Sequence, residues 1–425
     1  MREFLWIGSY LNEENFKYYQ KLGYKNASSY VSQKNIIEGL KKIGNINFDS
    51  LNMITFKGYP YDKTIYINQK VFDDAGNKNC VVGYLNILYL NKIFGSKSLE
   101  KQAKIWVNEN SVKLNDGLDI FVYEMRSACL NAAILIKNAI PNSKIHLIVP
   151  DLPMFMDLKM SLLKQGLKKI DWFCIKKQLA YVDDYILYTE SMASFLELKH
   201  KPWLLMEGSI NIKELDKNNS KSFSQNNKFI VMYSGNIDKE YGIVELINAF
   251  DYLDEQYELW ITGGGKYSEE LHKICSKNPK IKFFGFLPNR RDLLSLQEKA
   301  SAFINIRNPK IVASNYVFPS KLFEYMLTGK PVITCELAGI PSEYYKYLIK
   351  FQKLEPKEIS KTIKKIAKMP DKYRTKMGND AQKFICENKN NYVQAKKILE
   401  FIGYKNESMV INDEKIGDYK CNSIW

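Results

Sequence analysis

Histidine and long apolar runs are scarce in this sequence, and each absence excludes a class of protein. The only histidines, His146, His200 and His272, lie far apart, so a histidine-based metal site is not expected. The seven cysteines form no CxxC pair and show no metal-ligand spacing. No run of about 18 apolar residues is present, so no segment is expected to span a membrane.

A secretion signal is also lacking. The first residues, "MREFLWIGSY", pass straight into a strand-like run, without a hydrophobic signal region or a small-residue cleavage site. We therefore expect a cytoplasmic protein.

Acidic residues are outnumbered by basic ones, which gives a formal net charge of +15. This excess favours an anionic partner, which could be nucleic acid, a phospholipid surface or a phosphorylated substrate. No nucleic-acid-binding motif interleaves the lysines, so we expect no nucleic acid partner.

What is present is typical of packed globular domains. The composition is 45% hydrophobic and 13% aromatic, and 425 residues exceed one ordinary core. Strand-like and helix-like runs alternate in both halves, as in "LDIFVYEMR", "SACLNAAILIKNAI" and "KIHLIVPDLP". This alternation predicts an α/β fold with two Rossmann-like, doubly wound domains that face each other across a cleft. Residues 54–85 are less regular and suggest a β-hairpin excursion.

The polar stretch "DKNNSKSFSQNN" (216–227) is the best linker candidate. We expect an N-terminal acceptor domain at 1–210 and a C-terminal donor domain at 211–404. The final helix (389–404) is expected to pack back on the N-terminal domain, and 405–425 to form a tail.

A first candidate site lies in "VMYSGNIDKEYGIVEL". A buried strand ends at Ser234, and Gly235 lets the backbone approach a ligand closely. Lys239 can offer charge to a phosphate. The alternative is a plain strand-to-helix turn with a solvated lysine.

A second candidate lies in "FFGFLPNRRDLL", where a strand and a tight turn precede a helix that begins with two arginines. A flat base could stack here and bond to the exposed backbone of Phe286 and Leu287. A turn with two surface arginines, Arg290 and Arg291, explains the pattern equally well.

A third candidate lies in "NYVFPSKLFEYMLTGKPVI". Pro319 suits the first position of a helix, and Ser320 and Lys321 then lie in the first turn, where free N–H groups favour an anion. Glu324 falls one turn further along the same face and could accept two hydrogen bonds from a ribose diol. The alternative is an N-terminal salt bridge between Lys321 and Glu324.

These motifs, with "MYSGNIDKEYG", "GFLP" and "AGIPSEYY" in order around them, resemble the family 4 retaining glycosyltransferases of GT-B architecture. The resemblance is to bacterial enzymes that build capsule, exopolysaccharide or O-antigen, and it is specific over residues 228–404. It implies transfer of a hexose from a nucleotide sugar to a lipid-linked or oligosaccharide acceptor. UDP is the default nucleotide by family frequency.

The resemblance also implies roles for individual residues. Glu324 would hold the ribose, Leu287 would meet the base, and the diphosphate would face Ser320, Lys321 and the Leu322 amide. Such enzymes need no metal or other cofactor, because helix dipoles and basic side chains neutralise the leaving diphosphate.

The sequence departs from the family at three positions. Tyr316 replaces the first of two acids eight positions apart, Asn236 replaces an arginine, and Tyr241 replaces a lysine. Lys239 and Arg307 are the nearby cations that could substitute. These departures leave an alternative interpretation, in which the protein is a non-catalytic GT-B scaffold that binds a sugar and partners an active transferase. An epimerase acting on the donor alone is disfavoured, because suitable histidines and paired acids are lacking.

In the N-terminal half, Gly8 and Ser9 belong to the loop that approaches the diphosphate in the resembled family. Asp151, at the end of a predicted strand, could orient an acceptor hydroxyl or merely cap a turn. Asp151, Lys239 and Tyr316 are thus the candidate catalytic residues.

The segment 156–184 mixes lysines with large apolar residues and could dock on an anionic membrane at the inner face of the plasma membrane. The alternative is one or two surface helices that pack on the domain. The residues concerned are Leu162, Leu163, Lys164, Leu167, Lys168, Lys169, Trp172, Phe173, Ile175, Lys176 and Lys177.

Overall fold

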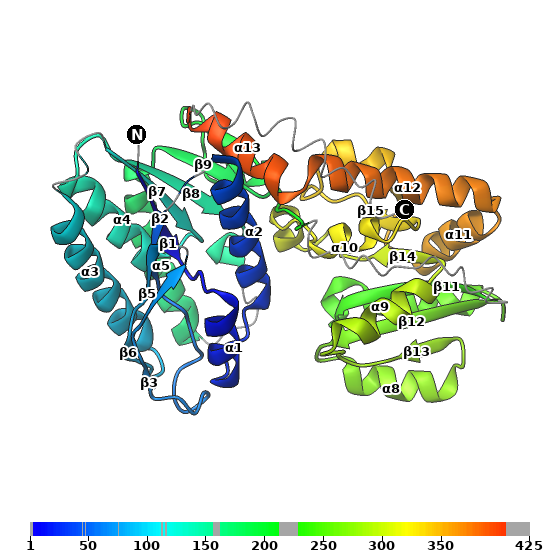
Figure 1. Cartoon of the computed structure of the whole chain (residues 1–425). Helices are drawn as coiled ribbons and strands as arrows, with labels where there is room; N and C mark the ends of the chain where they lie inside the picture. Colours follow the sequence, from blue (N-terminus) through cyan, green and yellow to red (C-terminus); the bar gives the residue numbers. More distant parts are fainter. Residues whose placement is uncertain are drawn as a thin grey trace. The chain divides into compact units, whose positions relative to one another are not determined.

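The computed structural model divides the chain into two compact units, which are described separately (Figure 1). Of the described residues, 3–209 with 391–404 form the N-terminal unit and 210–390 form the C-terminal unit. The expected linker at 216–227 and the expected tail at 405–425 lie outside the described residues. The structure describes residues 3–44, 46, 48–74, 76–111, 114, 117–155, 162–211 and 228–404, with the backbone alone at 162–164.

The N-terminal unit is built on an eight-stranded sheet in the order β10-β9-β8-β7-β1-β2-β5-β4. Every neighbouring pair is parallel except β4 with β5. All six residues of β7 are buried, as expected for a parallel sheet with helices on both faces. The strands are β1 (Glu3–Gly8), β2 (Phe48–Asn52), β4 (Lys70–Asp74), β5 (Asn77–Val81), β7 (Leu118–Tyr123), β8 (Lys144–Val149), β9 (Asp184–Leu187) and β10 (Trp203–Leu205).

The final helix α13 belongs to this unit, where it packs on α2 (Figure 1). Gly39 of α2 makes the close approach necessary, because a Cβ atom there would collide with the Asn391 carbonyl and crowd Ala395. The rings of Phe4 and Tyr404 also meet edge to face, with centroids 5.3 Å apart. The helices of the unit are α1 (Glu13–Lys21), α2 (Ala27–Gly44), α3 (Asn91–Asn110), α4 (Ser127–Ala139), α5 (Leu162–Gln178), α6 (Glu190–Phe195) and α13 (Asn391–Phe401).

The predicted hairpin excursion within residues 54–85 is confirmed. Strands β4 and β5 form an antiparallel hairpin at one edge of the sheet. Two further short strands, β3 (Tyr66–Ile67) and β6 (Tyr84–Leu85), pair antiparallel in a small sheet of their own.

The C-terminal unit has six parallel strands in the order β13-β12-β11-β14-β15-β16. Both units are therefore α/β domains with parallel sheets, and the predicted fold class is confirmed. The strands are β11 (Phe229–Asn236), β12 (Tyr257–Gly264), β13 (Ile281–Phe283), β14 (Ala302–Asn305), β15 (Val332–Cys335) and β16 (Ile349–Phe351). The helices are α7 (Ile243–Ala249), α8 (Ser268–Lys277), α9 (Arg290–Lys299), α10 (Lys321–Leu327), α11 (Pro356–Ala367) and α12 (Asp371–Asn388).

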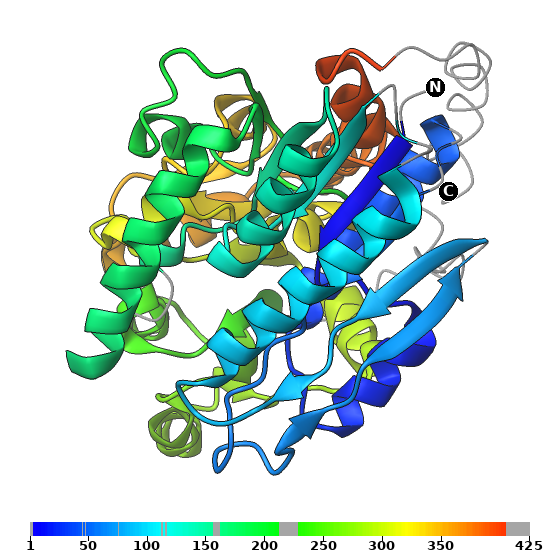
Figure 2. The ribbon, with the colours of Figure 1, turned by 90° about the vertical axis from the view of Figure 1, so that its left-hand side faces the viewer.

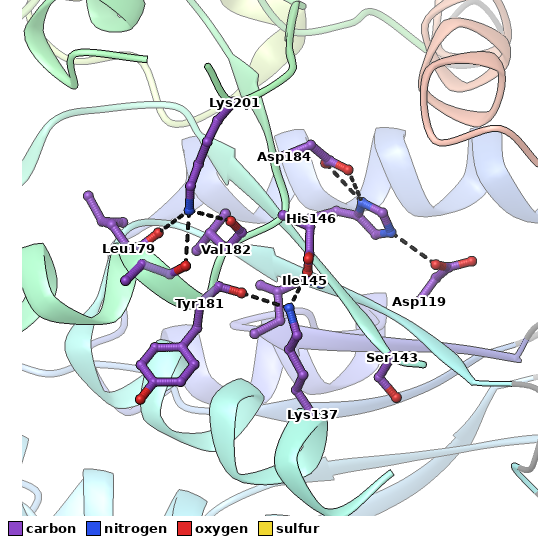
Figure 3. Close-up of polar contacts among 12 residues, drawn as sticks. Asp119, Lys137, Ser143, Ile145, His146, Leu179, Tyr181, Val182, Asp184 and Lys201 are labelled. Carbon is purple, nitrogen blue, oxygen red and sulfur yellow. Dashed lines mark hydrogen bonds and ion pairs between the residues drawn. The ribbon is translucent and has the colours of Figure 1, made fainter. Parts of the chain in front are cut away.

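A buried histidine lies between two aspartates in the N-terminal sheet (Figure 3). His146 of β8 is fully buried; its Nδ1 lies 2.8 Å from a carboxylate oxygen of Asp184, and its Nε2 lies 3.1 Å from Asp119. Burial lowers the pKa of His146, but the hydrogen bonds and charges of the two aspartates outweigh burial and raise that pKa to about 9. Asp184 is the first residue of β9 and Asp119 the second of β7, so the cluster lies toward the amino ends of the strands.

Candidate functional site

Most of the predicted donor-site residues follow the carboxyl ends of strands in the C-terminal unit. β11 ends at Asn236, and its neighbour β14 ends at Asn305. The sheet extends from β11 through β12 to β13 on one side and from β14 through β15 to β16 on the other. The switch point of the topology therefore lies between β11 and β14, where open α/β sheets bind their ligands.

Glycines bring the carboxyl ends of β11 and β12 into close contact. Gly263 has φ +125, and a Cβ atom there would collide with the Gly235 carbonyl. The Tyr233 hydroxyl donates to the Asn236 carbonyl at 2.8 Å. The end of β11, which carries the predicted residues Gly235 and Asn236, is thus held in place, and the Asn236 side chain is left exposed.

Two cations lie against tyrosine rings near the end of β11. Lys239 Nζ lies 4.9 Å from the centre of the Tyr267 ring, after β12. The guanidinium carbon of Arg307 lies 5.6 Å from the centre of the Tyr241 ring. Burial raises the pKa of Tyr233 to about 12, and the charge of Arg307 opposes that rise. Arg307 therefore brings a positive charge to the place where Tyr241 replaces the expected lysine.

Helix α10 begins two residues later than the sequence predicts. Ser320 is its N-cap residue, so Pro319 precedes the helix, and the prediction that Pro319 is its first residue is wrong. The Leu322 N–H donates to the Pro319 carbonyl at 2.8 Å, and the Phe323 N–H donates to the Ser320 carbonyl at 3.2 Å. This three-residue spacing is that of a tightened first turn. The Leu322 amide, predicted to face the diphosphate, is thus bonded within the turn.

The ion pair that the sequence left as an alternative is present in α10. Lys321 Nζ lies 2.7 Å and 2.9 Å from the two carboxylate oxygens of Glu324. The side chains are 39% and 47% exposed, and an exposed pair of this kind contributes about 0–1 kcal/mol. A carboxylate has about four lone-pair sites, so Glu324 keeps acceptor capacity beyond this pair.

A buried tyrosine joins α10 to the end of β11. The Tyr325 hydroxyl accepts from the Ser234 N–H at 2.8 Å and donates to the Ser234 carbonyl at 2.9 Å. Burial raises the pKa of Tyr325 well above its usual value, so the hydroxyl keeps its proton. Because Ser234 precedes Gly235 and Tyr325 follows Glu324, this contact fixes two predicted binding elements relative to each other.

Replacing Tyr325 with phenylalanine is expected to destabilise the C-terminal unit by about 1–3 kcal/mol, because both backbone groups of Ser234 lose a buried partner. Urea unfolding measures the change. Tyr373→Phe is the matched control, since that side chain is 64% exposed. Equal stability of the two variants would show that the contact contributes nothing.

Tyr316 also lies on the segment that leads into α10. It ends a 3-10 turn, Val312–Tyr316, and is half-buried. A Cβ atom at Gly339 would collide with the Val317 carbonyl, so the loop after β15 packs directly on this segment. The approach explains why glycine stands at position 339.

The predicted base-binding residues follow β13. The Gly263 N–H donates to the Gly285 carbonyl at 2.8 Å, which ties this loop to the end of β12. The Phe286 side chain is 75% exposed, and Leu287 is half-buried. Helix α9 begins shortly afterwards at Arg290, so the arginines lie in its first turn as predicted.

Three predicted site residues belong to the N-terminal unit. The buried Ser9 donates its N–H to Gln33 Oε1 at 2.9 Å, and its hydroxyl accepts from Gln33 Nε2 at 2.8 Å. Gly8 has no room for a side chain, because a Cβ atom would meet Gln33. Asp151 follows β8 and is half-buried. Burial raises the pKa of Tyr188 to about 12, and the charge of Asp151 adds to that rise.

A charged pair that the sequence does not reveal lies at the switch point of the N-terminal sheet, between β7 and β1. Glu124 directly follows β7 with φ +71, which is rare for a residue other than glycine. Its carboxylate accepts from the Ser29 hydroxyl at 2.8 Å and lies 3.1 Å from Arg126 Nε. The run "LDIFVYEMR" predicts a strand. The charged residues that follow its apolar residues are the only feature of the run that points to this pair.

Among the described residues, no group of three or more His, Cys, Asp or Glu side chains is arranged to hold a metal ion. None of the helices described here is long and apolar enough to cross a membrane.

Residues 215–384 match the family model of "Glycosyl transferases group 1". No curated protein matches the chain in sequence. The match covers the sheet edge described above, including the loop after β11 and helix α10.

Solved structures with the same fold extend over nearly the whole chain. HepE of Anabaena, crystallised in complex with UDP, is 13% identical with a TM-score of 0.62 and covers 95% of this chain and 100% of its own. The lipopolysaccharide outer core galactosyltransferase WaaB is 12% identical with a TM-score of 0.61 and the same coverage. An E. coli trehalose-6-phosphate protein bound with UDP-2-fluoro glucose is 11% identical, with a TM-score of 0.64 and coverage of 94% and 99%. The chain therefore has the GT-B fold, and residues 215–384 carry the sequence pattern of group 1 glycosyl transferases.

Proposed function

We propose that the chain is a retaining, metal-independent glycosyltransferase that moves a hexose from a UDP-sugar to a lipid-linked or oligosaccharide acceptor. We assign it to bacterial surface polysaccharide synthesis at the cytoplasmic side of the plasma membrane. The proposal rests on the sequence resemblance, on the family match over residues 215–384 and on the fold. HepE and the E. coli trehalose-6-phosphate protein, whose structures contain UDP or a UDP-sugar analogue, support UDP as the nucleotide.

The observation that carries the proposal is the contact between Tyr325 and Ser234. These residues are far apart in the sequence, and each is the chain neighbour of a predicted donor-binding residue. A nucleotide diphosphate needs a close backbone approach, cations and a diol acceptor near one another. The contact joins the glycine-containing end of β11 to the helix that carries Lys321 and Glu324.

In this proposal the C-terminal unit binds the donor. Glu324 accepts hydrogen bonds from the ribose hydroxyls, and Ser320 and Lys321 meet the diphosphate. The base lies against Phe286 and Leu287. These roles suit the exposed side chains of Ser320, Glu324 and Phe286.

The proposed reaction exchanges one bond at the anomeric carbon of the sugar. The bond to the diphosphate oxygen breaks, and a bond to the acceptor oxygen forms on the same face. The acceptor proton passes to a phosphate oxygen of the departing UDP. Arg307 and Lys239 stabilise the negative charge of the leaving group, Tyr316 contacts the donor sugar, and Asp151 orients the acceptor hydroxyl.

Replacing Arg307 with methionine is expected to lower the rate of UDP release from the UDP-sugar by about 10²–10³, because a fixed positive charge is lost where negative charge develops. A coupled assay of UDP release, with water or a saccharide as acceptor, measures this rate. Lys273→Met is the control, because Lys273 is an exposed lysine of α8. An unchanged rate in the Arg307 variant would remove that residue from the reaction.

The replacements at Asn236, Tyr241 and Tyr316 favour the second candidate, a GT-B scaffold that binds a nucleotide sugar without turnover. Incubation with a UDP-sugar and an oligosaccharide acceptor, followed by NMR of the anomeric proton, separates the two. A product with the donor's anomeric configuration supports the retaining transferase. Binding of the UDP-sugar with neither transfer nor hydrolysis supports the scaffold.

An anionic membrane surface is a further part of the proposal, and α5 supplies the first support. Leu167, Ile170 and Phe173 are 43%, 62% and 59% exposed, so this face does not pack on the domain. Ile175 points the other way and is fully buried. Lys177 lies with Nζ 4.4 Å from the centre of the Phe173 ring. Residues 156–161, which the predicted docking segment also includes, lie outside the described residues.

A further inference from the structure

Exposed apolar side chains are concentrated in one short part of the N-terminal unit. Scattered exposed apolar residues are normal on a protein surface, whereas a contiguous group signals an interaction site. Ten large apolar side chains between positions 59 and 93 are 36–70% exposed, and all but Val71 of β4 lie within residues 59–66 or 85–93. These nine form one set. We call this set the apolar platform: Tyr59, Tyr61, Ile65, Tyr66, Leu85, Ile87, Tyr89, Leu90 and Ile93.

Backbone pairing holds the platform residues on one frame. Tyr66 pairs with Leu85 between β3 and β6, and Tyr59 forms a bridge with Ile87. The Tyr59 N–H donates to the Asn86 carbonyl at 2.7 Å. The platform residues therefore lie on two segments, 59–66 and 85–93, whose backbones pair with each other.

Two buried asparagines hold the loops of this frame from inside, beside buried apolar side chains such as Ile67 and Tyr84. Asn86 is fully buried and donates from Nδ2 to the Thr64 carbonyl at 2.8 Å. Asn91 is also buried and donates from Nδ2 to the Phe56 carbonyl at 3.0 Å. These buried contacts close the loops from inside, so the exposed tyrosines and aliphatic side chains are not needed to close them. A group of exposed apolar side chains on such a frame favours an apolar or interfacial partner.

The exposed charges around the platform are mainly positive. Lys57, Lys63 and Lys92 are exposed. The nearest acid, Asp62, is half-buried and accepts from the Lys57 N–H at 2.5 Å. Tyrosine is enriched where proteins meet the lipid headgroups, and lysines beside it are attracted to anionic lipid.

The start of α3, which carries the platform residue Ile93, lies near α5. Lys92 lies beside the platform residue Ile93 at the start of α3. Burial raises the pKa of Asp171 of α5, and the charge of Lys92 opposes that rise. Helix α4 packs against both α3 and α5. Figure 2 shows α3 and α5 on the face of the unit turned toward the viewer. The basic and apolar surface therefore extends over two separate parts of the chain.

We propose that the apolar platform rests in the headgroup region of an anionic bilayer and, together with α5, holds the chain at the membrane. The inference deepens the proposed function, because it rests on a lipid-linked acceptor and names the surface that reaches it. A second copy of the chain is a poorer occupant, because the exposed lysines beside the two facing platforms would repel each other. An anionic bilayer neutralises the same lysines.

Cosedimentation with vesicles tests the inference on the full chain. Wild-type protein is expected to bind phosphatidylglycerol-containing vesicles and to bind phosphatidylcholine vesicles far more weakly. The double variant Tyr61→Ser/Leu90→Ser is expected to lose about tenfold or more in affinity, since two interfacial anchors are removed. The control Tyr252→Ser/Tyr373→Ser removes two exposed tyrosines of the C-terminal unit and is expected to bind as the wild type does.

Three outcomes would overturn the inference: no binding of the wild type to anionic vesicles, equal losses in the platform and control variants, or a wild-type dimer in light scattering that the platform variant abolishes. The last would identify a second copy as the occupant. UDP-sugar affinity, measured on the same variants, is expected to be unchanged. A failure of the platform can thus be told from a failure of the donor site.

Discussion

Replacing Glu324 with alanine is expected to weaken binding of the UDP-sugar by about ten- to a hundredfold. Hydrogen bonds to a charged group such as this carboxylate contribute about 1.5–3 kcal/mol. Because about 1.4 kcal/mol corresponds to a factor of ten in affinity, their loss gives the expected fold-change. Stability is expected to change little, because the lost ion pair with Lys321 is exposed. Isothermal titration with UDP and thermal unfolding measure the two quantities.

The matched control for this variant is Glu336→Ala. Glu336 is also exposed and pairs with a lysine, Lys350, at 3.1 Å, but it lies in the loop after β15. Its replacement is expected to leave UDP affinity unchanged. If Glu324→Ala binds UDP as tightly as the Glu336 variant, the ribose is not held by Glu324 and the site is assigned wrongly.

Replacing His146 with leucine is expected to destabilise the N-terminal unit by about 3–5 kcal/mol. The variant leaves Asp119 and Asp184 buried without the cation between them, and breaking a buried ion pair by removing one partner costs about this much. Urea unfolding measures the loss. His200→Leu is the control, because His200 is exposed.

The same cluster predicts a dependence of stability on pH. The pKa of His146 is raised from 6.5 to about 9 in the folded state. A basic group whose pKa is higher in the folded than in the unfolded protein stabilises the fold. This stabilisation is fully present at pH values below the pKa of the unfolded state, and it is lost as the pH rises through the pKa of the folded state. The wild type should therefore lose about 3 kcal/mol between pH 6.5 and about pH 9.

A triple variant isolates this effect from other titrating groups. Asp119→Asn/His146→Leu/Asp184→Asn removes every charge of the cluster and should show a flatter stability profile over the same pH range. It should also be more stable than His146→Leu alone, since no buried carboxylate then faces the leucine. Parallel pH profiles of the wild type and the triple variant would show that His146 is not protonated in the folded protein.

The strands could be predicted from sequence because parallel strands are buried on both faces and appear as continuous apolar runs. The run "LDIFVY" is such a case, and every residue of β7 is buried. The start of α10 was harder, because the φ of proline suits both a helix and the turn before it. The structure uses Pro319 in the turn, and the helix begins at Lys321.

Contacts between elements could not be predicted, because they depend on strand order and register. The sequence identifies Ser320, Lys321 and Glu324 as a group, since they share one short helix. It gives no indication that Tyr325 bonds to Ser234, or that Arg307 lies on the Tyr241 ring. The apolar platform could not be predicted for a different reason. The sequence does not distinguish an exposed tyrosine from a tyrosine in the core.

The most direct test of the central claim is a thermal unfolding series of the purified protein with UDP-, GDP-, TDP- and CMP-sugars, in buffer without added metal. A ligand at about 100 times its dissociation constant stabilises the native state by about 2.7 kcal/mol, and each kcal/mol raises Tm by about 2–4 °C in a domain of this size. We expect a selective rise of several degrees with a UDP-sugar. No rise with any of the four would contradict a nucleotide-sugar site in the C-terminal unit.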